Sequence, residues 1–167
     1  MRVGLLADSH DRVPAIAEFA KLFAEAGVGL VLHAGDFCAP FSLRPIRDKN
    51  LTLAGVFGRN DGDHEGLRLE AARGMGTELY ESPHSVEVET KRILVVHDIG
   101  EVNQRSLDEH AFVVTGFTHR HGIERSDSCV IINPGEACGW LTGVPSAAIL
   151  DLETGAVEFL TLDALPG

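Results

Sequence analysis

Carboxylate and imidazole side chains follow five apolar runs of this chain, at the points where strands are expected to end. Because ligand sites in open α/β sheets form at the carboxyl ends of strands, these side chains are expected to meet at one edge. Such a mixed oxygen and nitrogen donor set suits Mn, Fe, Zn, Co or Ni, and the lack of thiolates disfavours a structural zinc site. The set comprises Asp8 with His10, Asp36, Arg59 with Asn60 and Asp61, His97, and His119.

Each of these residues also has a purely structural interpretation when it is taken alone. Asp8 could cap a helix, and His33, inside an apolar run, is expected to be a hydrogen-bonded core residue. His121 would share a strand face with His119, but it is a weaker candidate ligand. The ordered set carries more weight than its members, because chance rarely places such residues after five strands. The histidines expected on the solvated surface are His64, His84 and His110.

The elements that must position these residues alternate in the first half of the chain between short apolar runs and helical spacing. The second half is mostly strands, beginning with a hairpin whose alternating residues indicate one wet face. This pattern predicts one α/β domain, residues 1–167, with two sheets packed face to face and helices outside. Helices are expected at 13–26, 41–48, 64–73 and 102–110, and strands at 3–7, 28–33, 51–57, 85–89, 93–96, 112–115, 122–125, 128–132, 146–151 and 156–160.

The composition excludes several classes of protein. A chain of 167 residues that is 44% hydrophobic is long enough to bury its own core. The net charge of −11 repels nucleic-acid backbones and anionic lipid, so long nucleic acid and membranes are not expected partners. The apolar run before Asp8 is too short for a signal peptide or a membrane span, and three unpaired cysteines fit a reducing compartment. A cytoplasmic protein is therefore expected.

Taken together, the motifs resemble those of the calcineurin-like metallophosphoesterases. The resemblance is closer to their small single-domain prokaryotic phosphodiesterases, which are related to the retromer scaffold subunit. It implies a four-layer αββα sandwich, made of two mixed β-sheets with helices outside, and a two-metal site that cuts phosphoester bonds. The motifs that carry it are Asp8-Ser9-His10, Gly35-Asp36, Gly58-Arg59-Asn60-Asp61, His97, Gly116-Phe117-Thr118-His119 and Asn133-Pro134-Gly135.

The resemblance carries over to the two metal positions unequally. For the second position the family pattern implies Asp36 and His97, but Arg59 stands where the family has Asn and Phe117 where it has His. Arg stays protonated and cannot offer a lone pair, and a phenyl ring is not a ligand. One ion per chain is therefore favoured over two, with manganese expected first. The ligands implied for the first position are all present, namely Asp8, His10, Asp36 and His119.

The main hypothesis is a phosphodiesterase that works with one metal, with an activity below that of two-metal relatives. Arg59 would balance Asp36 and hold phosphate oxygens through its planar fork, with Asn60 beside it in the substrate site. His97, freed from a second metal, would donate a proton to the leaving group. Asp61 would orient its neighbours within the catalytic loop.

Two alternatives remain open at this stage. The retromer relative shows that the fold can persist without catalysis, so a metal-poor protein-binding scaffold is one of them. The other keeps two metals, if the strand end slips so that Asn60 takes the ligand position and Arg59 points outward. A larger slip could also recruit His121.

The resemblance leaves the substrate and partners broadly defined. The chain has no spare length for a cap over the site, so an open groove is expected, suited to a small phosphodiester, a nucleotide or a phosphoprotein. Relatives are often dimers or tetramers, so a homodimer and a homotetramer are both open for this chain, and no stretch of the sequence marks an interface. Trp140 is a candidate for a partner surface, although packing over the back sheet is its expected arrangement.

Overall fold

The computed structural model describes residues 1–73 and 78–163, and within them the strands form two mixed sheets. One sheet has the order β11-β10-β1-β2-β3-β4 and the other β5-β6-β7-β9-β8. The strands are β1 (Arg2–Leu6), β2 (Leu30–His33), β3 (Thr52–Val56), β4 (Leu79–Tyr80), β5 (His84–Val88), β6 (Lys91–Val96), β7 (Phe112–Thr115), β8 (Gly122–Arg125), β9 (Val130–Asn133), β10 (Ser146–Asp151) and β11 (Val157–Thr161).

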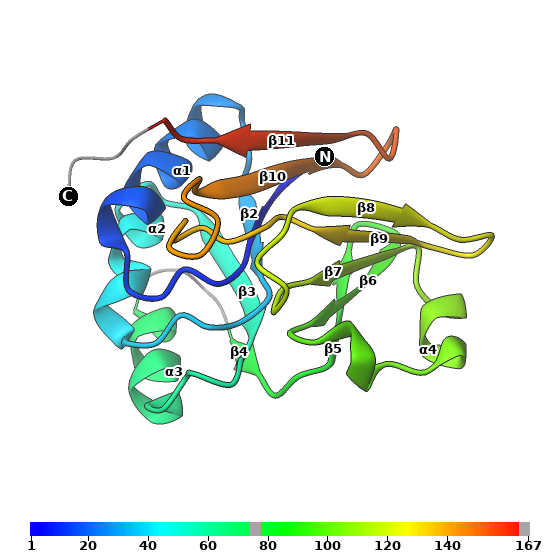
Figure 1. The fold of residues 1–167 in the computed structure, drawn as a ribbon, viewed down its shortest axis with the longest axis horizontal. Coiled ribbons are helices and arrows are strands. Elements are labelled where there is room, and N and C mark those ends of the chain that lie inside the picture. Colours follow the sequence, from blue (N-terminus) through cyan, green and yellow to red (C-terminus); the bar gives the residue numbers. More distant parts are fainter. Residues whose placement is uncertain (74–77, 164–167) are drawn as a thin grey trace.

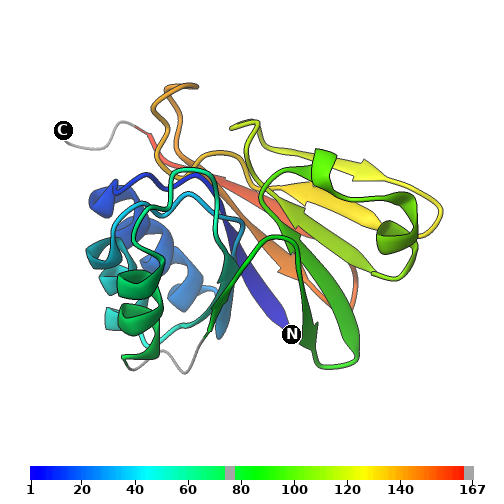
Figure 2. The same ribbon diagram turned by 90° about the horizontal axis from the view of Figure 1, so that it is seen from below.

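The two sheets pack face to face between two layers of helices (Figures 1 and 2). The core between the sheets includes Leu5 and Val95, and a second core under the first sheet includes Phe19 and Phe23. The predicted arrangement of two face-to-face sheets with helices outside is therefore confirmed. Helices α1 (Val13–Glu25), α2 (Arg44–Asp48) and α3 (His64–Ala72) cover the first sheet, and α4 (Gln104–Asp108) covers the second.

Parallel pairing aligns the ends of the strands that precede the candidate site residues. Leu6 pairs with His33, and His33 pairs with Gly55, so β1, β2 and β3 release their loops at the same edge. In the second sheet Val96 lies opposite Thr115, which aligns the loops after β6 and β7. These loops gather at the upper edge of Figure 2, away from the N-terminus.

Glycines allow these loops to approach one another closely. A Cβ atom at Gly58 would overlap the carboxylate of Asp36, and one at Gly116 would lie 3.0 Å from Asp8 Oδ2. The backbone N–H of Asp8 donates to Gly35 O at 3.0 Å, and that of Gly116 donates to His97 O at 3.0 Å. Side chains from both sheets therefore reach one small volume.

Some expected elements differ from the structure. The helix expected at 102–110 is reduced to the short α4, whose start is capped by the Asn103 side chain, and a 3₁₀ turn, Ile99–Glu101, precedes it. The helix expected at 41–48 is likewise split into a 3₁₀ turn, Pro40–Leu43, and α2. The two-residue strand β4 was not predicted, since it is too short to show a pattern.

The surface assignment of His110 is wrong. Its ring is buried, with Nδ1 2.6 Å from Ser106 O and Nε2 2.9 Å from Ser85 Oγ. The turn at the end of α4 brings this ring onto β5, a contact that its polar sequence neighbours do not reveal. His33 is buried as expected, and it is hydrogen-bonded to Ser9 and Gly35.

Candidate metal centre

Three side chains from two different loops form one cluster at the shared edge of the sheets. Candidate ligand atoms of Asp8, His10 and His119 all lie within 4.8 Å of one another. Asp8 follows β1, and His119 follows β7 of the other sheet. The His10 and His119 rings stack with their centroids 5.5 Å apart, so both imidazoles face the same carboxylate edge.

Asp36 joins this cluster to a second group on its other side. Its Oδ2 lies 3.4 Å from His10 Nε2, and its Oδ1 lies 3.6 Å from His97 Nε2. Candidate ligand atoms of Asp8, Asp36 and His97 also lie within 4.8 Å of one another. Asp36 therefore lies between the two candidate positions, as a bridging carboxylate would.

The outer nitrogen of each imidazole has a partner that turns the inner nitrogen toward the site. His119 Nδ1 lies 2.8 Å from Glu136 Oε2, His97 Nδ1 lies 2.8 Å from Ala34 O, and His10 Nδ1 lies 3.5 Å from Cys38 Sγ. A carbonyl or carboxylate oxygen accepts only, so Nδ1 of His97 and of His119 carries the hydrogen. Nε2 of His97 and of His119 then presents a lone pair to the centre, the arrangement typical of metal-ligating histidine.

The donor set passes a test for a divalent metal. Within the described residues, the buried side-chain atoms with no hydrogen-bond partner are Asp8 Oδ1, His10 Nε2 and His97 Nε2. Buried polar atoms are rarely left unpaired, so three at one point indicate a missing partner. Two ligands held by one ion at bonds of about 2.1 Å lie roughly 3.0–3.5 Å apart. The 3.4 Å between His10 Nε2 and Asp36 Oδ2 and the 3.7 Å between His119 Nε2 and Asp8 Oδ1 are near that separation.

Burial and hydrogen bonding set the ionisation of the carboxylates. Burial raises the pKa of Asp8 to about 6, against the opposing influence of His119 and His97. Burial also acts to raise the pKa of Asp36, but hydrogen bonds from Asn60 and the nearby imidazoles leave it lowered. Burial lowers the pKa of His10. A neutral imidazole beside these carboxylates is the form that binds a metal.

Backbone strain accompanies these side chains. The four residues implied as ligands of the first position all have positive φ: Asp8 at 50°, His10 at 38°, Asp36 at 61° and His119 at 61°. This left-handed region is uncommon for residues other than glycine, although Asp, Asn and His tolerate it best. Strained residues cluster at functional sites, where the surrounding structure holds them in place.

Glu136 is a site residue that the sequence analysis missed. It is fully buried and accepts hydrogen bonds from the backbone N–H of Leu141 and Thr142 and from the Thr142 hydroxyl, in addition to His119. Burial acts to raise its pKa, but these hydrogen bonds outweigh it and lower the pKa to about 2. The available signal was an acidic residue directly after the Asn133-Pro134-Gly135 motif.

The comparisons with known proteins agree with this site. Residues 1–155 match the model of the calcineurin-like phosphoesterase superfamily domain. The chain belongs to the calcineurin-like phosphoesterase superfamily. Membership confirms the predicted family and the prediction of a hydrolase that acts on phosphoesters, and it implies a divalent metal.

Several relatives match nearly the whole length of this superfamily member. The phosphodiesterase MJ0936 of Methanocaldococcus jannaschii is 32% identical over 171 residues, covering 98% of this chain and all of the relative. A solved structure described as a novel archaeal phosphodiesterase has a TM-score of 0.87 at 29% identity, covering 97% of this chain and all of that one. Vps29 of Entamoeba histolytica, solved with zinc, has a TM-score of 0.70 at 20% identity, covering 98% and 99%, and shares the fold.

The structure places the two replaced ligands of the family pattern at the rim of the site. The Arg59 guanidinium donates to Asp98 Oδ2 at 2.6 Å and lies 3.8 Å from Glu101, with its side chain 55% exposed. It covers the Phe117 ring at 4.2 Å, and that ring meets His97 edge-on with centroids 5.8 Å apart. The Arg59 guanidinium is therefore paired with acidic side chains at the rim, and no pattern in the sequence indicates its pairing with Asp98.

Asn60 occupies the place beside Asp36 that Arg59 does not take. Its backbone N–H donates to Asp36 Oδ1 at 2.9 Å and its side-chain amide donates to Oδ2 at 2.7 Å. Asp61 has a different surrounding, because its carboxylate accepts the backbone N–H groups of Asp36, Cys38 and Gly58 at 2.7–3.0 Å. Asp61 thus joins the loops after β2 and β3 through hydrogen bonds. Asn60, in contrast, contacts the candidate ligand Asp36 directly.

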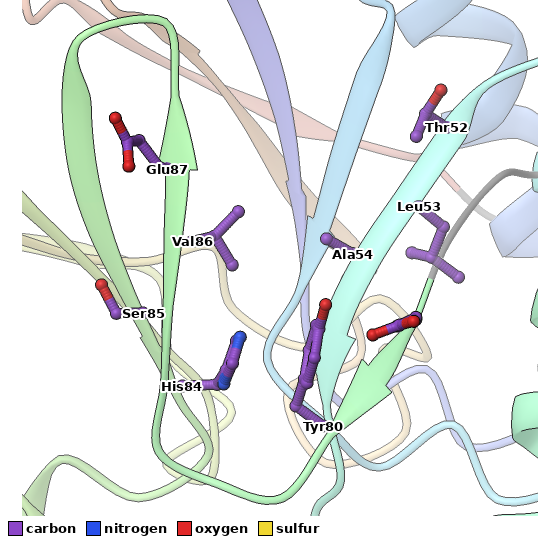
Figure 3. Close-up of a pocket in the computed structure, with 9 residues that line it drawn as sticks. Thr52, Leu53, Ala54, Tyr80, His84, Ser85, Val86 and Glu87 are labelled. Atoms are coloured by element: carbon purple, nitrogen blue, oxygen red, sulfur yellow. The ribbon is translucent and has the colours of Figure 1, made fainter.

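A hollow at the side of the sandwich contains none of the predicted site residues (Figure 3). It lies between β3 and β5, and the parallel rings of Tyr80 and His84, 3.5 Å apart, stand in it. His121 is also outside the centre, since its ring packs against Phe159. Among the described residues, none of the helices combines the length and apolar character needed to cross a membrane.

Proposed function

We propose that this chain is a metal-dependent phosphodiesterase with one divalent ion held by Asp8, His10, Asp36 and His119. The observation that carries the proposal is that the buried atoms Asp8 Oδ1 and His10 Nε2 have no hydrogen-bond partner and lie close to the other two ligands. Asp8 Oδ1 is 3.7 Å from the Nε2 atom of His119, and His10 Nε2 is 3.4 Å from the Oδ2 atom of Asp36. The relative MJ0936, named a phosphodiesterase and matched along its full length, supports the diester as substrate. Manganese is the ion we propose first, since this donor set suits it.

When bound, such an ion supplies Lewis-acid chemistry, lowering the pKa of a water and polarising a phosphoryl oxygen. The residues around it supply orientation and proton transfer. His97 is held through Nδ1 by Ala34 O, and its Nε2 lone pair faces the centre without another partner. This nitrogen can take up a proton, for example from the attacking water, and the resulting imidazolium can then give it to the leaving oxygen. The Asn60 amide borders the same carboxylate and can donate to a phosphate oxygen.

The second position is proposed to hold no ion. It retains Asp36 and His97, but the Phe117 ring stands beside His97 where the family pattern has imidazole. The Arg59 guanidinium stacked on that ring keeps a fixed positive charge at the rim. In a chain with a net charge of −11, this cation can draw an anionic ester toward the site.

The test is metal content measured together with hydrolysis. The protein, expressed with manganese, is assayed by elemental analysis and with bis(4-nitrophenyl) phosphate. We expect about one ion per chain and diester hydrolysis, both lost in His119→Ala. His121→Ala is the matched control two residues away, and its ring packs on Phe159 instead of the centre.

Other outcomes would overturn the proposal in distinct ways. About two ions per chain would mean that Asn60 or another residue completes the second position. No ion and no hydrolysis, even with metal in excess, would replace the enzyme by a protein-binding scaffold of the same fold. Full activity in His119→Ala would show that the ligand assignment is wrong.

A further inference from the structure

Trp140 stands in solvent directly beside the metal centre. It is the sole tryptophan of the chain, and its side chain is 61% exposed, so the expectation that it packs over the back sheet is wrong. Its ring stacks with His10, centroids 6.3 Å apart and planes 26° apart. His10 stacks in turn on His119, so the indole ends a row of three rings whose other two members are candidate ligands.

The loop that carries Trp140 is anchored to the same carboxylate that orients a ligand. Glu136 accepts the N–H groups of Leu141 and Thr142 on one side and meets His119 Nδ1 on the other. The backbone N–H of Cys138 donates to Asp8 O at 3.1 Å, and Arg12 donates to Cys138 O. The loop that carries Trp140, orange at the top of Figure 2, is therefore held at a fixed position beside the centre.

The exposure of this ring is not explained by the fold. Burying a large apolar side chain stabilises a protein, whereas Trp140 leaves most of its surface in water while its loop is tightly held. An aromatic face presented at a fixed position beside a phosphoester site has the form of a stacking platform. Bases stack on such faces whatever their identity, because each base has a π-face.

We propose that Trp140 stacks on the nucleobase of the substrate, which makes the substrate class a nucleotide diester; this rests on the proposed phosphodiesterase function. In this arrangement the phosphate would lie on the ion that the carboxylates hold, and the base would extend past His10 to the indole. The net charge of −11 disfavours long nucleic acid but not a single diester with few charges. A small nucleotide is therefore the occupant that charge and position both favour.

The first test uses the fluorescence of Trp140, which has no other tryptophan to obscure it. The manganese-loaded protein is titrated with adenosine 5′-monophosphate and, separately, with ribose 5-phosphate, which has the same phosphate and sugar but no base. Saturable quenching by the nucleotide alone supports the platform. Equal responses to both compounds, or none to either, would overturn it.

The second test compares two diesters with the same leaving group. Thymidine 5′-(4-nitrophenyl phosphate) and methyl 4-nitrophenyl phosphate both release 4-nitrophenolate, so they differ only in the nucleoside. Trp140→Ala should raise KM for the nucleotide ester about tenfold, the low end of the effect of losing one base stack, with kcat unchanged. Trp140→Phe should restore most of it, and Leu141→Ala, whose side chain is 76% exposed in the same loop, should behave as wild type.

The outcomes separate the two proposals. A KM rise of the same size for both esters would overturn the assignment of the nucleobase. If the wild type hydrolyses neither ester but its fluorescence still distinguishes the nucleotide from ribose 5-phosphate, the phosphodiesterase proposal fails and the nucleotide site stands.

Discussion

The two sides of the metal centre use the same sheet edge for different purposes. On one side His10 and His119 stack on each other and aim Nε2 atoms at the carboxylates of Asp8 and Asp36. On the other side His97 keeps the same orientation through Ala34, but its neighbours are the phenyl ring of Phe117 and the guanidinium stacked on it. The first side gathers the side chains proposed to hold an ion, and the second has the fixed positive charge of Arg59 at its rim.

The difference teaches that the partners behind the ligands decide what a position can hold. His119 is braced by Glu136, which is buried and tied to a loop, so the imidazole cannot turn away. Arg59 is held by Asp98 and Glu101 at the surface, where it can form its ion pair only by pointing outward.

The largest effect is expected from Asp8→Asn. The amide removes the charge of a buried oxygen that has no partner, while its shape suits the left-handed backbone at this position. We expect metal to be lost and kcat/KM to fall at least about 1000-fold, or about 4 kcal/mol of barrier. Elemental analysis measures the metal content and diester kinetics measure kcat/KM. An unchanged metal content would show that Asp8 is not a ligand.

His97→Ala should reduce kcat about 100-fold, within the range of a lost proton donor, and leave metal content unchanged. The reason is that His97 lies on the side proposed to hold no ion. If the metal content fell with the activity, His97 would be a ligand, and the side with His97 would also take part in binding the ion.

Glu136→Gln should weaken metal binding about 10–100-fold, as is typical when the partner behind a metal-ligating histidine is changed. Gln keeps an oxygen for the N–H groups of Leu141 and Thr142, so the loop should stay in place. Competition with a metal indicator gives the affinity. Circular dichroism checks the fold, and unaltered affinity would show that the carboxylate serves only the loop.

Replacing Arg59 by Asn and Phe117 by His restores the family pattern on the altered side. This double variant should bind about two ions per chain and hydrolyse diesters about tenfold faster, which corresponds to about 1.4 kcal/mol. Arg59→Asn alone is the control and should still bind one ion, since Phe117 remains. An unaltered ion count in the double variant would show that the backbone, and not the side chains, forbids the second ion.

A separate effect, on the stability of the fold and not on activity, is expected at His33, which lies beneath the side that Glu136 orients. Gly35 N–H donates to its Nδ1, so Nε2–H donates to Ser9 Oγ and the ring is neutral; burial lowers its pKa to about 3. The unfolded chain therefore binds one more proton between pH 6.5 and 3, and this term weakens the fold by about 1.4 kcal/mol per unit of acidification. Denaturant unfolding of His33→Gln at several pH values should lack that part of the slope.

Residues placed by strand ends could be predicted from the sequence, and residues placed by loop contacts could not. Asp8, Asp36, His97 and His119 were expected at one edge because parallel register brings strand ends together. The directions of Arg59 and Trp140 depend on a single ion pair and on hydrogen bonds to a buried carboxylate, which leave no periodic pattern. The two-sheet architecture could be predicted because most strands are long enough to show a hydrophobic pattern. Strand β4 has only 2 residues, which is too short for such a pattern, and it was missed.

The positive φ angles of Asp8, His10, Asp36 and His119 have an evolutionary consequence. Each such residue costs of order 1–3 kcal/mol of backbone energy, which glycine would largely avoid. In a lineage that kept only the shape of this protein, drift toward glycine at these four positions would relieve that cost. A chain with glycine at these four positions would be free of this backbone cost and would have no side chains there to hold an ion, so the cost belongs to the proposed ion site and not to the shape of the fold.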